Sequence, residues 1–227
     1  MDFTAWADID LGNFTIIDLI AATTNAFNGA ILARQPSHYR KYTVVGILLI
    51  AIFGGIGGGV SRDVLLNDIP SALTNPFYLI LCALAGFLAL RITGRLDEAR
   101  TTRLFDFMSA FSLPWYAAVG CNKALEAQLP YLGCILIGVI GPTAGRFLID
   151  ITSGVTPQQF VRGEWFVGTA VLTSVVYLIA DAGLGLSIWP ATLIAFAVGF
   201  PFRILSRRLQ WEEPMPNNQE GAAVLSS

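Results

Sequence analysis

Five glycines and an arginine–aspartate pair share one short stretch of the chain, residues 54–63. Carbonyl oxygens that a helix break releases can coordinate a cation, and an arginine inside a membrane can gate a pore or form an ion pair. The apolar residues 42–53 would rise about 18 Å as a helix, a little more than half of a hydrocarbon core about 30 Å thick. The glycines are therefore predicted to break a helix near mid-membrane, where freed backbone groups must face protein or a wet cavity.

Other interpretations of the glycines can be compared by spacing. The stretch lacks the Gly-Lys-Ser/Thr ending of a phosphate-binding P-loop and the Gly-x-Gly-x-x-Gly spacing of a dinucleotide site. A contact between helices remains open, since Gly54 with Gly58, or Gly55 with Gly59, has the small-x-x-x-small spacing that lets two helices approach closely.

Composition indicates the class of protein. Of 227 residues, 54% are hydrophobic and 13% are charged, and the mean hydropathy is +0.61. These values predict one compact integral membrane bundle. The three cysteines lie in apolar segments and are interpreted as core residues, and the single histidine, His38, has no second imidazole or thiolate beside it to form a metal site. We expect no catalytic residues, no enzymatic activity, no bound metal and no nucleic-acid partner.

The elements that must position these residues are apolar spans. Seven transmembrane helices are predicted at residues 14–33, 42–66, 76–92, 104–125, 130–151, 165–182 and 188–205. The expected fold is thus an all-α membrane protein in a single transmembrane domain, 1–227. Residues 211–227 have the polar, proline-containing composition of a disordered tail.

The first six spans are predicted to form two three-helix repeats, 14–93 and 104–182, with residues 188–206 as an extra seventh helix. Asp18 and Asp106 open the first and fourth spans, and the sequence from Gly57 to Arg62 aligns with that from Gly141 to Arg146. An odd number of spans in each repeat makes the two repeats inverted in the membrane. The fifth span is predicted to break at Gly141, as the second does at its glycines.

Basic residues predict the orientation. One set of loops and helix ends carries Arg34, Arg40, Lys41, Arg91, Arg95, Arg100, Arg103, Arg162, Arg203, Arg207 and Arg208, and the opposite set carries Lys123. By the positive-inside rule, the amino terminus is expected outside and the carboxyl terminus in the cytoplasm. The four arginines between residues 91 and 103 either bind anionic lipid head groups or only determine topology. Lys123 and Glu126, one helical turn apart, are interpreted as a surface pair.

The sequence resembles the family of prokaryotic trimeric intracellular cation (TRIC) channels, whose half-repeat is described as a glycine-transporter-like domain. The resemblance covers roughly residues 14–206. It rests on the three-plus-three-plus-one layout and on the motif Gly57-Gly58-Gly59-x-x-Arg62-Asp63-Val64-Leu65-Leu66 followed by Ile69-Pro70. The second copy differs: Gly141-Pro142-Thr143 replaces the triplet, Phe147 follows the arginine, and the acid comes only at Asp150.

The resemblance implies a homotrimer in the plasma (inner) membrane, in which each protomer conducts potassium and other monovalent cations between its broken second and fifth helices. The resemblance also implies that the protein has no tightly bound cofactor. Its small-molecule partners would be the permeating potassium or sodium and membrane lipid. The pore and hinge residues would be Gly54, Gly55, Gly57, Gly58, Gly59, Ser61, Gly141, Pro142, Thr143 and Gly145. A secondary transporter for a small solute such as glycine, built from the same repeats, is the alternative.

Arginine inside a membrane is costly, about 2.5–3.5 kcal/mol at the centre on insertion scales, so Arg62 and Arg146 are expected to meet acids. The candidate acids are Asp63, Asp150, Asp18 and Asp106. Two roles remain open for these residues. They form ion pairs that clamp the repeats together, or the arginines line the pore as a gate.

Overall fold

The computed structural model describes residues 13–35, 38, 42–157, 159 and 165–212. The helices among them are α1 Asn13–Leu32, α2 Val44–Leu65, α3 Ser71–Thr74, α4 Phe77–Thr93, α5 Glu98–Glu126, α6 Tyr131–Thr152, α7 Phe166–Leu178 with a π-helical turn Ile179–Gly183, and α8 Ile188–Arg208. Most of the tail predicted to be disordered, 213–227, lies outside the described residues.

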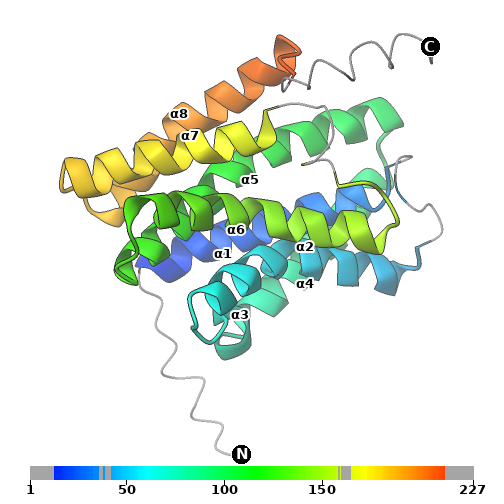
Figure 1. Cartoon of the computed structure of the whole chain (residues 1–227). Helices are drawn as coiled ribbons and strands as arrows, with labels where there is room; N and C mark the ends of the chain where they lie inside the picture. The colour runs from blue at the N-terminus through cyan, green and yellow to red at the C-terminus, as the bar shows by residue number, and fades with distance from the viewer. Residues whose placement is uncertain (1–12, 36–37, 39–41, 158, 160–164, 213–227) are drawn as a thin grey trace, which may run out of the picture.

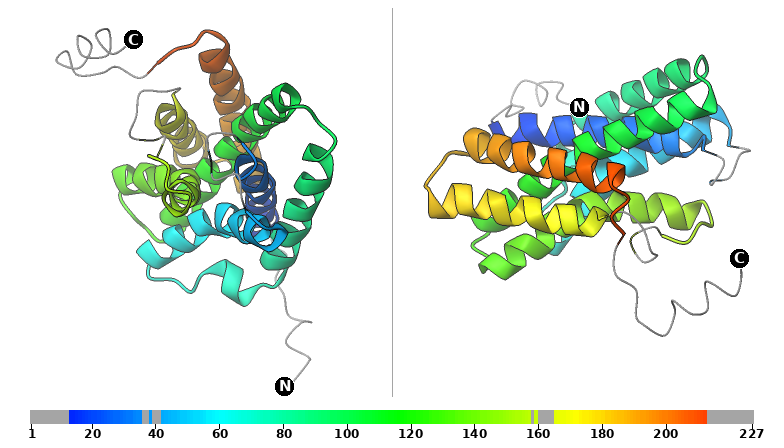
Figure 2. Two further views of the ribbon diagram at one scale, coloured as in Figure 1. Left: turned by 90° about the vertical axis from the view of Figure 1, so that its right-hand side faces the viewer. Right: turned by 90° about the horizontal axis from the view of Figure 1, so that it is seen from above.

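The long helices lie side by side in one bundle (Figure 1). Helix α1 runs through its middle, in contact with α2, α4, α5 and α8, and the view along the bundle shows it surrounded (Figure 2). Alanines at positions 22, 26 and 30 of α1 are almost fully buried. Because they recur every four residues on one helical face, they let neighbouring helices pack close to α1.

Local sequence signals set several helix ends. The side chain of Thr43 accepts a hydrogen bond from the amide of Gly46 at 3.1 Å at the start of α2. Asp97 does the same for Arg100 at 2.7 Å at the start of α5. Each bond satisfies one amide that has no partner within its helix. Helix α6 begins directly after Pro130, a position where the missing amide hydrogen of proline costs nothing.

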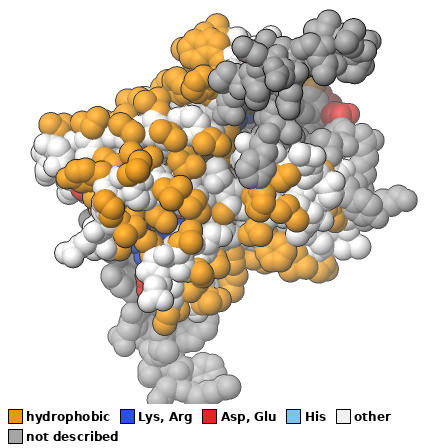
Figure 3. All heavy atoms as spheres, viewed as in Figure 1, with side chains coloured by type: hydrophobic (Ala, Val, Ile, Leu, Met, Phe, Trp, Pro, Cys, Tyr) orange, Lys and Arg blue, Asp and Glu red, His pale blue; other side chains and the backbone are white. Residues whose placement is uncertain are grey.

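The outer surface is that of a membrane protein. Large apolar side chains are exposed along several helices, among them Leu84 on α4 and Leu136 on α6, and hydrophobic side chains dominate the face drawn in Figure 3. Within the part of the chain that the structure describes, five helical segments are long and apolar enough to span a membrane: α1, α2, α6, α7 with its π-helical turn, and α8. Helix α4 is shorter, with 17 residues, and α5 carries a charged first turn, so the seven-span count stays a prediction.

The predicted helix breaks are wrong. Helix α2 continues through residues 54–59, and α6 continues through Gly141 and Pro142. Each glycine costs about 1 kcal/mol relative to alanine in a helix interior, but it keeps its helical hydrogen bond. Only Pro142, which has no amide hydrogen, loses one. The glycines instead allow close contacts between helices. This is the other interpretation of the small-x-x-x-small spacing that the sequence analysis left open.

Candidate functional site

Helices α2 and α6 cross at their glycines with almost no space between the backbones. A methyl group on Gly58 would overlap the carbonyl oxygen of Gly141, and one on Gly145 would lie 2.8 Å from the carbonyl oxygen of Gly54. Gly59 differs, because among the described residues a methyl group there would meet only the Arg62 guanidinium, at 3.7 Å. The crossing therefore requires glycine at residue 58 but not at residue 59.

Tyr116 of α5 closes the same crossing from one side. Its ring lies 3.4 Å from the position that a Cβ atom on Gly58 would take. Its hydroxyl donates a hydrogen bond to the carbonyl oxygen of Gly55, and the side chain is 1% exposed. No signal in the sequence distinguishes Tyr116 from other apolar-span residues, so sequence reasoning missed it.

A first cluster of charges is buried at one end of the bundle, around Arg62 near the end of α2. Arg62 is 0% exposed and donates two hydrogen bonds to Asp18 of α1, from Nη1 at 3.0 Å and from Nη2 at 3.1 Å. Its Nε donates to Asp63 at 2.7 Å. Tyr78 of α4 donates its hydroxyl to the same Asp18 at 2.8 Å. The guanidinium thus links α1 and α2 through paired, charge-assisted hydrogen bonds.

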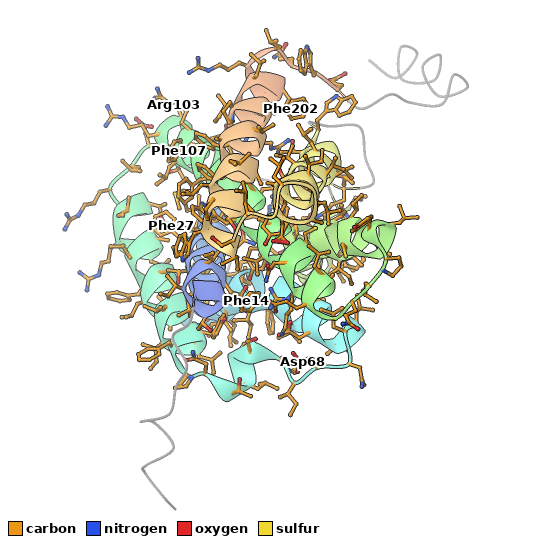
Figure 4. The ribbon with its side chains drawn as sticks, turned by 90° about the vertical axis from the view of Figure 1, so that its left-hand side faces the viewer. Phe14, Phe27, Asp68, Arg103, Phe107 and Phe202 are labelled. Atoms are coloured by element: carbon orange, nitrogen blue, oxygen red, sulfur yellow. The ribbon has the colours of Figure 1, made fainter. Side chains whose placement is uncertain are left out.

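Lys123 of α5 extends this cluster, and its interpretation as a surface partner of Glu126 is wrong. Its Nζ donates to Asp63 at 2.8 Å and contacts Asp68 at 2.9 Å, whereas Glu126 accepts from Asn122 instead. The hydrogen bond and charge of Lys123 lower the pKa of Asp68, which lies in the turn after α2. Figure 4 shows this end of the bundle, with Phe14 of α1 and Asp68 labelled.

A second cluster lies around Arg146 of α6, fifteen residues into a helix that runs opposite to α2. Arg146 donates from Nε to Asp150 at 2.8 Å, and the Nε2 atom of His38 lies 3.1 Å from the same Asp150 oxygen. Asp150 is 0% exposed and His38 is 5% exposed. His38, which sequence reasoning placed only in a basic loop, therefore belongs to a buried network at the opposite end from Arg62.

The other predicted site residues lie apart from these ion pairs. Asp106, which the sequence analysis predicted to be the counterpart of Asp18 in the second repeat, pairs with Arg207 of α8. Ser61 donates its hydroxyl to the Gly57 carbonyl at 2.8 Å. Thr143 donates to the Val139 carbonyl at 2.7 Å. Both hydroxyls are thus bonded to their own helices.

A small polar cavity of about 20 Å³ lies between the α2–α6 crossing and the second cluster. Its polar lining comes from three helices, with Asn25 and Asn28 from α1, Ser109 and Ser112 from α5, and Arg146 from α6. Gly54 and Pro142 line the cavity next to the helix crossing, and Leu32, Leu113, Ile149 and Phe166 supply its apolar lining. The Oδ1 atom of Asn28 is buried and has no hydrogen-bond partner in the described part of the chain. The volume suffices for about one water molecule.

A family model described as "Glycine transporter" matches two segments of this chain, residues 15–93 and 106–182, together well over half of it. The chain belongs to this family, the TRIC family. Relatives of the TRIC-family chain include a UPF0126 membrane protein of Deinococcus radiodurans, 28% identical over 68% of this chain and 69% of the relative. The UPF0126 inner membrane protein YadS of Escherichia coli is 20% identical, over 88% of this chain and 93% of the YadS chain.

Solved structures share the fold of this TRIC-family chain. A structure that concerns conductance through TRIC cation channels superposes with a TM-score of 0.76 at 26% identity, covering 91% of this chain and 98% of the other. The TRIC channel orthologue of Rhodobacter sphaeroides gives a TM-score of 0.74 at 23% identity, over 85% and 95% of the two chains. These structural neighbours are ion channels, and the relatives are membrane proteins.

Proposed function

We propose that this protein is a homotrimeric monovalent cation channel of the plasma membrane, selective for potassium, with one pathway per protomer between α2 and α6. The observation that carries the proposal is the polar cavity beside the α2–α6 crossing, in a chain whose solved structural neighbours are TRIC cation channels. Amide and hydroxyl oxygens of Asn25, Asn28, Ser109 and Ser112 are suitable partners for a partly dehydrated monovalent cation.

The described conformation is closed under this proposal. The backbone contact between Gly58 and Gly141 and the hydrogen bond from Tyr116 to Gly55 occupy the space beyond the cavity. Conduction then requires α2 and α6 to separate at the glycines. Separation there breaks few side-chain contacts, because glycine has no side chain.

Arg146 contributes a positive charge to the cavity, and this charge opposes the passage of a cation unless a carboxylate offsets it. Its Nε donates a hydrogen bond to the buried carboxylate of Asp150, one turn further along α6. A carboxylate this close offsets the repulsion that an isolated guanidinium would exert on a permeating cation. Arg62, at the other end, is offset in the same way by Asp18 and Asp63.

Planar-bilayer recording of the purified protein tests the proposal. We expect unitary current steps that reverse at the potassium equilibrium potential under a potassium gradient. We expect Arg146→Gln to raise the unitary conductance for cations, because it removes the positive charge that lines the cavity. The control is Arg207→Gln, which removes an arginine that pairs with Asp106 and does not line the cavity. Electrically silent bilayers together with saturable glycine uptake would instead establish the transporter alternative.

The orientation and the inverted repeats are part of the same proposal. In a background without Cys82, Cys121 and Cys134, single cysteines at Thr74 and Arg95 are expected to react with membrane-impermeant reagents from opposite sides. Thr74 precedes α4 and Arg95 follows it, and both are exposed. We expect Arg95→Cys to be labelled from the cytoplasm. Labelling of both positions from one side would contradict a membrane-spanning α4 and, with it, two inverted three-helix repeats.

A further inference from the structure

A second and larger cavity lies away from the α2–α6 crossing. It measures about 510 Å³ and lies where α1 and α4 end and α2 and α5 begin. These are the helix ends that the positive-inside rule assigns to the cytoplasmic face. The volume falls within the range of small-molecule sites. The channel proposal makes no use of this cavity.

One wall carries hydrogen-bond donors. Arg34, just after α1, donates from Nη1 to the Leu90 carbonyl at 3.2 Å and to the Thr93 hydroxyl at 3.0 Å. Within the described residues these bonds engage only Nη1, and they hold the guanidinium at the cavity with its other donors available. The neighbouring Gln35 has a buried Nε2 atom without a hydrogen-bond partner in the described part of the chain. An oxyanion would satisfy both groups.

The remaining walls are of two kinds. Glu98, in the first turn of α5, supplies a carboxylate, so the described residues of the lining include one basic and one acidic side chain. Val44, Ile47 and Leu90 supply an apolar surface that continues outward to the exposed Val45 on α2. A ligand that matches these walls has a phosphate, a hydrogen-bonding ammonium group and an apolar portion that leaves toward the membrane.

We propose that this cavity binds the head group of a phosphatidylethanolamine lipid. The phosphate is held by Arg34 and Gln35, the ammonium by Glu98, and the acyl chains follow the apolar wall into the bilayer. The four arginines between residues 91 and 103, where the sequence suggested head-group binding, are outside the lining. Arg91 lies over the ring of Phe87, 4.8 Å from its centroid, and Arg100 pairs with Asp97 at 3.4 Å.

The test is thermal unfolding of the full chain in detergent, titrated with phosphatidylethanolamine, phosphatidylglycerol or phosphatidylcholine. We expect the largest stabilisation from phosphatidylethanolamine, because phosphatidylglycerol has no ammonium for Glu98 and the ammonium of phosphatidylcholine has no hydrogen to donate. Arg34→Gln is expected to raise the half-saturating lipid concentration about tenfold, since it removes a charged hydrogen bond to the phosphate. Glu98→Gln is expected to remove the preference for phosphatidylethanolamine over phosphatidylglycerol.

Arg103→Gln is the matched control. It removes a basic residue from the same helix end, outside the cavity lining, and is expected to keep the wild-type lipid response. Native mass spectrometry of the wild type alone supplies a readout that depends on no variant folding, and we expect bound phosphatidylethanolamine. The same response in wild type, Arg34→Gln and Glu98→Gln would overturn the proposal. Full stabilisation by water-soluble glycerophosphoethanolamine would overturn the lipid assignment and identify a free phosphate ester as the ligand.

Discussion

Replacement of Arg62 by methionine is expected to destabilise the folded protein by about 3–5 kcal/mol, the usual cost when one partner of a buried ion pair is removed. Asp18 would lose both of its guanidinium hydrogen bonds and keep, from the described part of the chain, the hydroxyl of Tyr78. Asp63 would still bind Lys123. Most of the cost therefore arises at Asp18, a carboxylate that is 2% exposed.

Two further variants make this measurement specific. In the Arg62→Met, Asp18→Asn double variant much of the stability should return, since no unpaired charge is left at Asp18. Arg146→Met should cost less, because Asp150 keeps His38 as a partner and the Arg146 side chain is 19% exposed. Unfolding in a denaturing detergent titration measures all three. If Arg62→Met unfolds at the wild-type midpoint but channel opening loses its voltage dependence, then Arg62 gates the channel and does not stabilise the fold.

Gly58→Ala is expected to destabilise the protein by about 1–3 kcal/mol, the usual cost of overpacking a core. The new methyl group would overlap the Gly141 carbonyl, so α2 and α6 must move apart. In channel recordings the same variant should favour the open state, because the contact that closes the proposed pathway is lost. Thermal unfolding and open probability measure the two effects on one sample.

Gly59→Ala is the matched control, one residue along the same helix. Its methyl group has room, so we expect it to stabilise the protein by about 0.5–1 kcal/mol, the usual gain from replacing glycine in a helix interior. Equal effects of the two substitutions would contradict a close contact at Gly58. The comparison also separates helix propensity from packing, because both positions lie in the continuous helix α2.

The membrane class and the positions of the helices could be predicted from the sequence alone. Apolar runs and their polar boundaries are local properties of the chain, and the second predicted span, 42–66, falls close to α2, Val44–Leu65. The state of the glycines could not be predicted in this way. A glycine is compatible with a helix break and with a close contact, and only the position of α6 against Gly58 favours the contact.

The partners of the buried arginines depended on tertiary structure in the same way. Composition shows that an arginine in an apolar span needs an acid, and four candidate acids could be named. Which acid it meets depends on how each helix is rotated and on which helix lies beside it. Asp18 faces Arg62 because α1 packs against α2, whereas Asp106 faces Arg207 because α5 also packs against α8. The sequence by itself determined the need for pairing, and helix packing decided the pairs, because residues far apart in the chain meet only in the folded bundle.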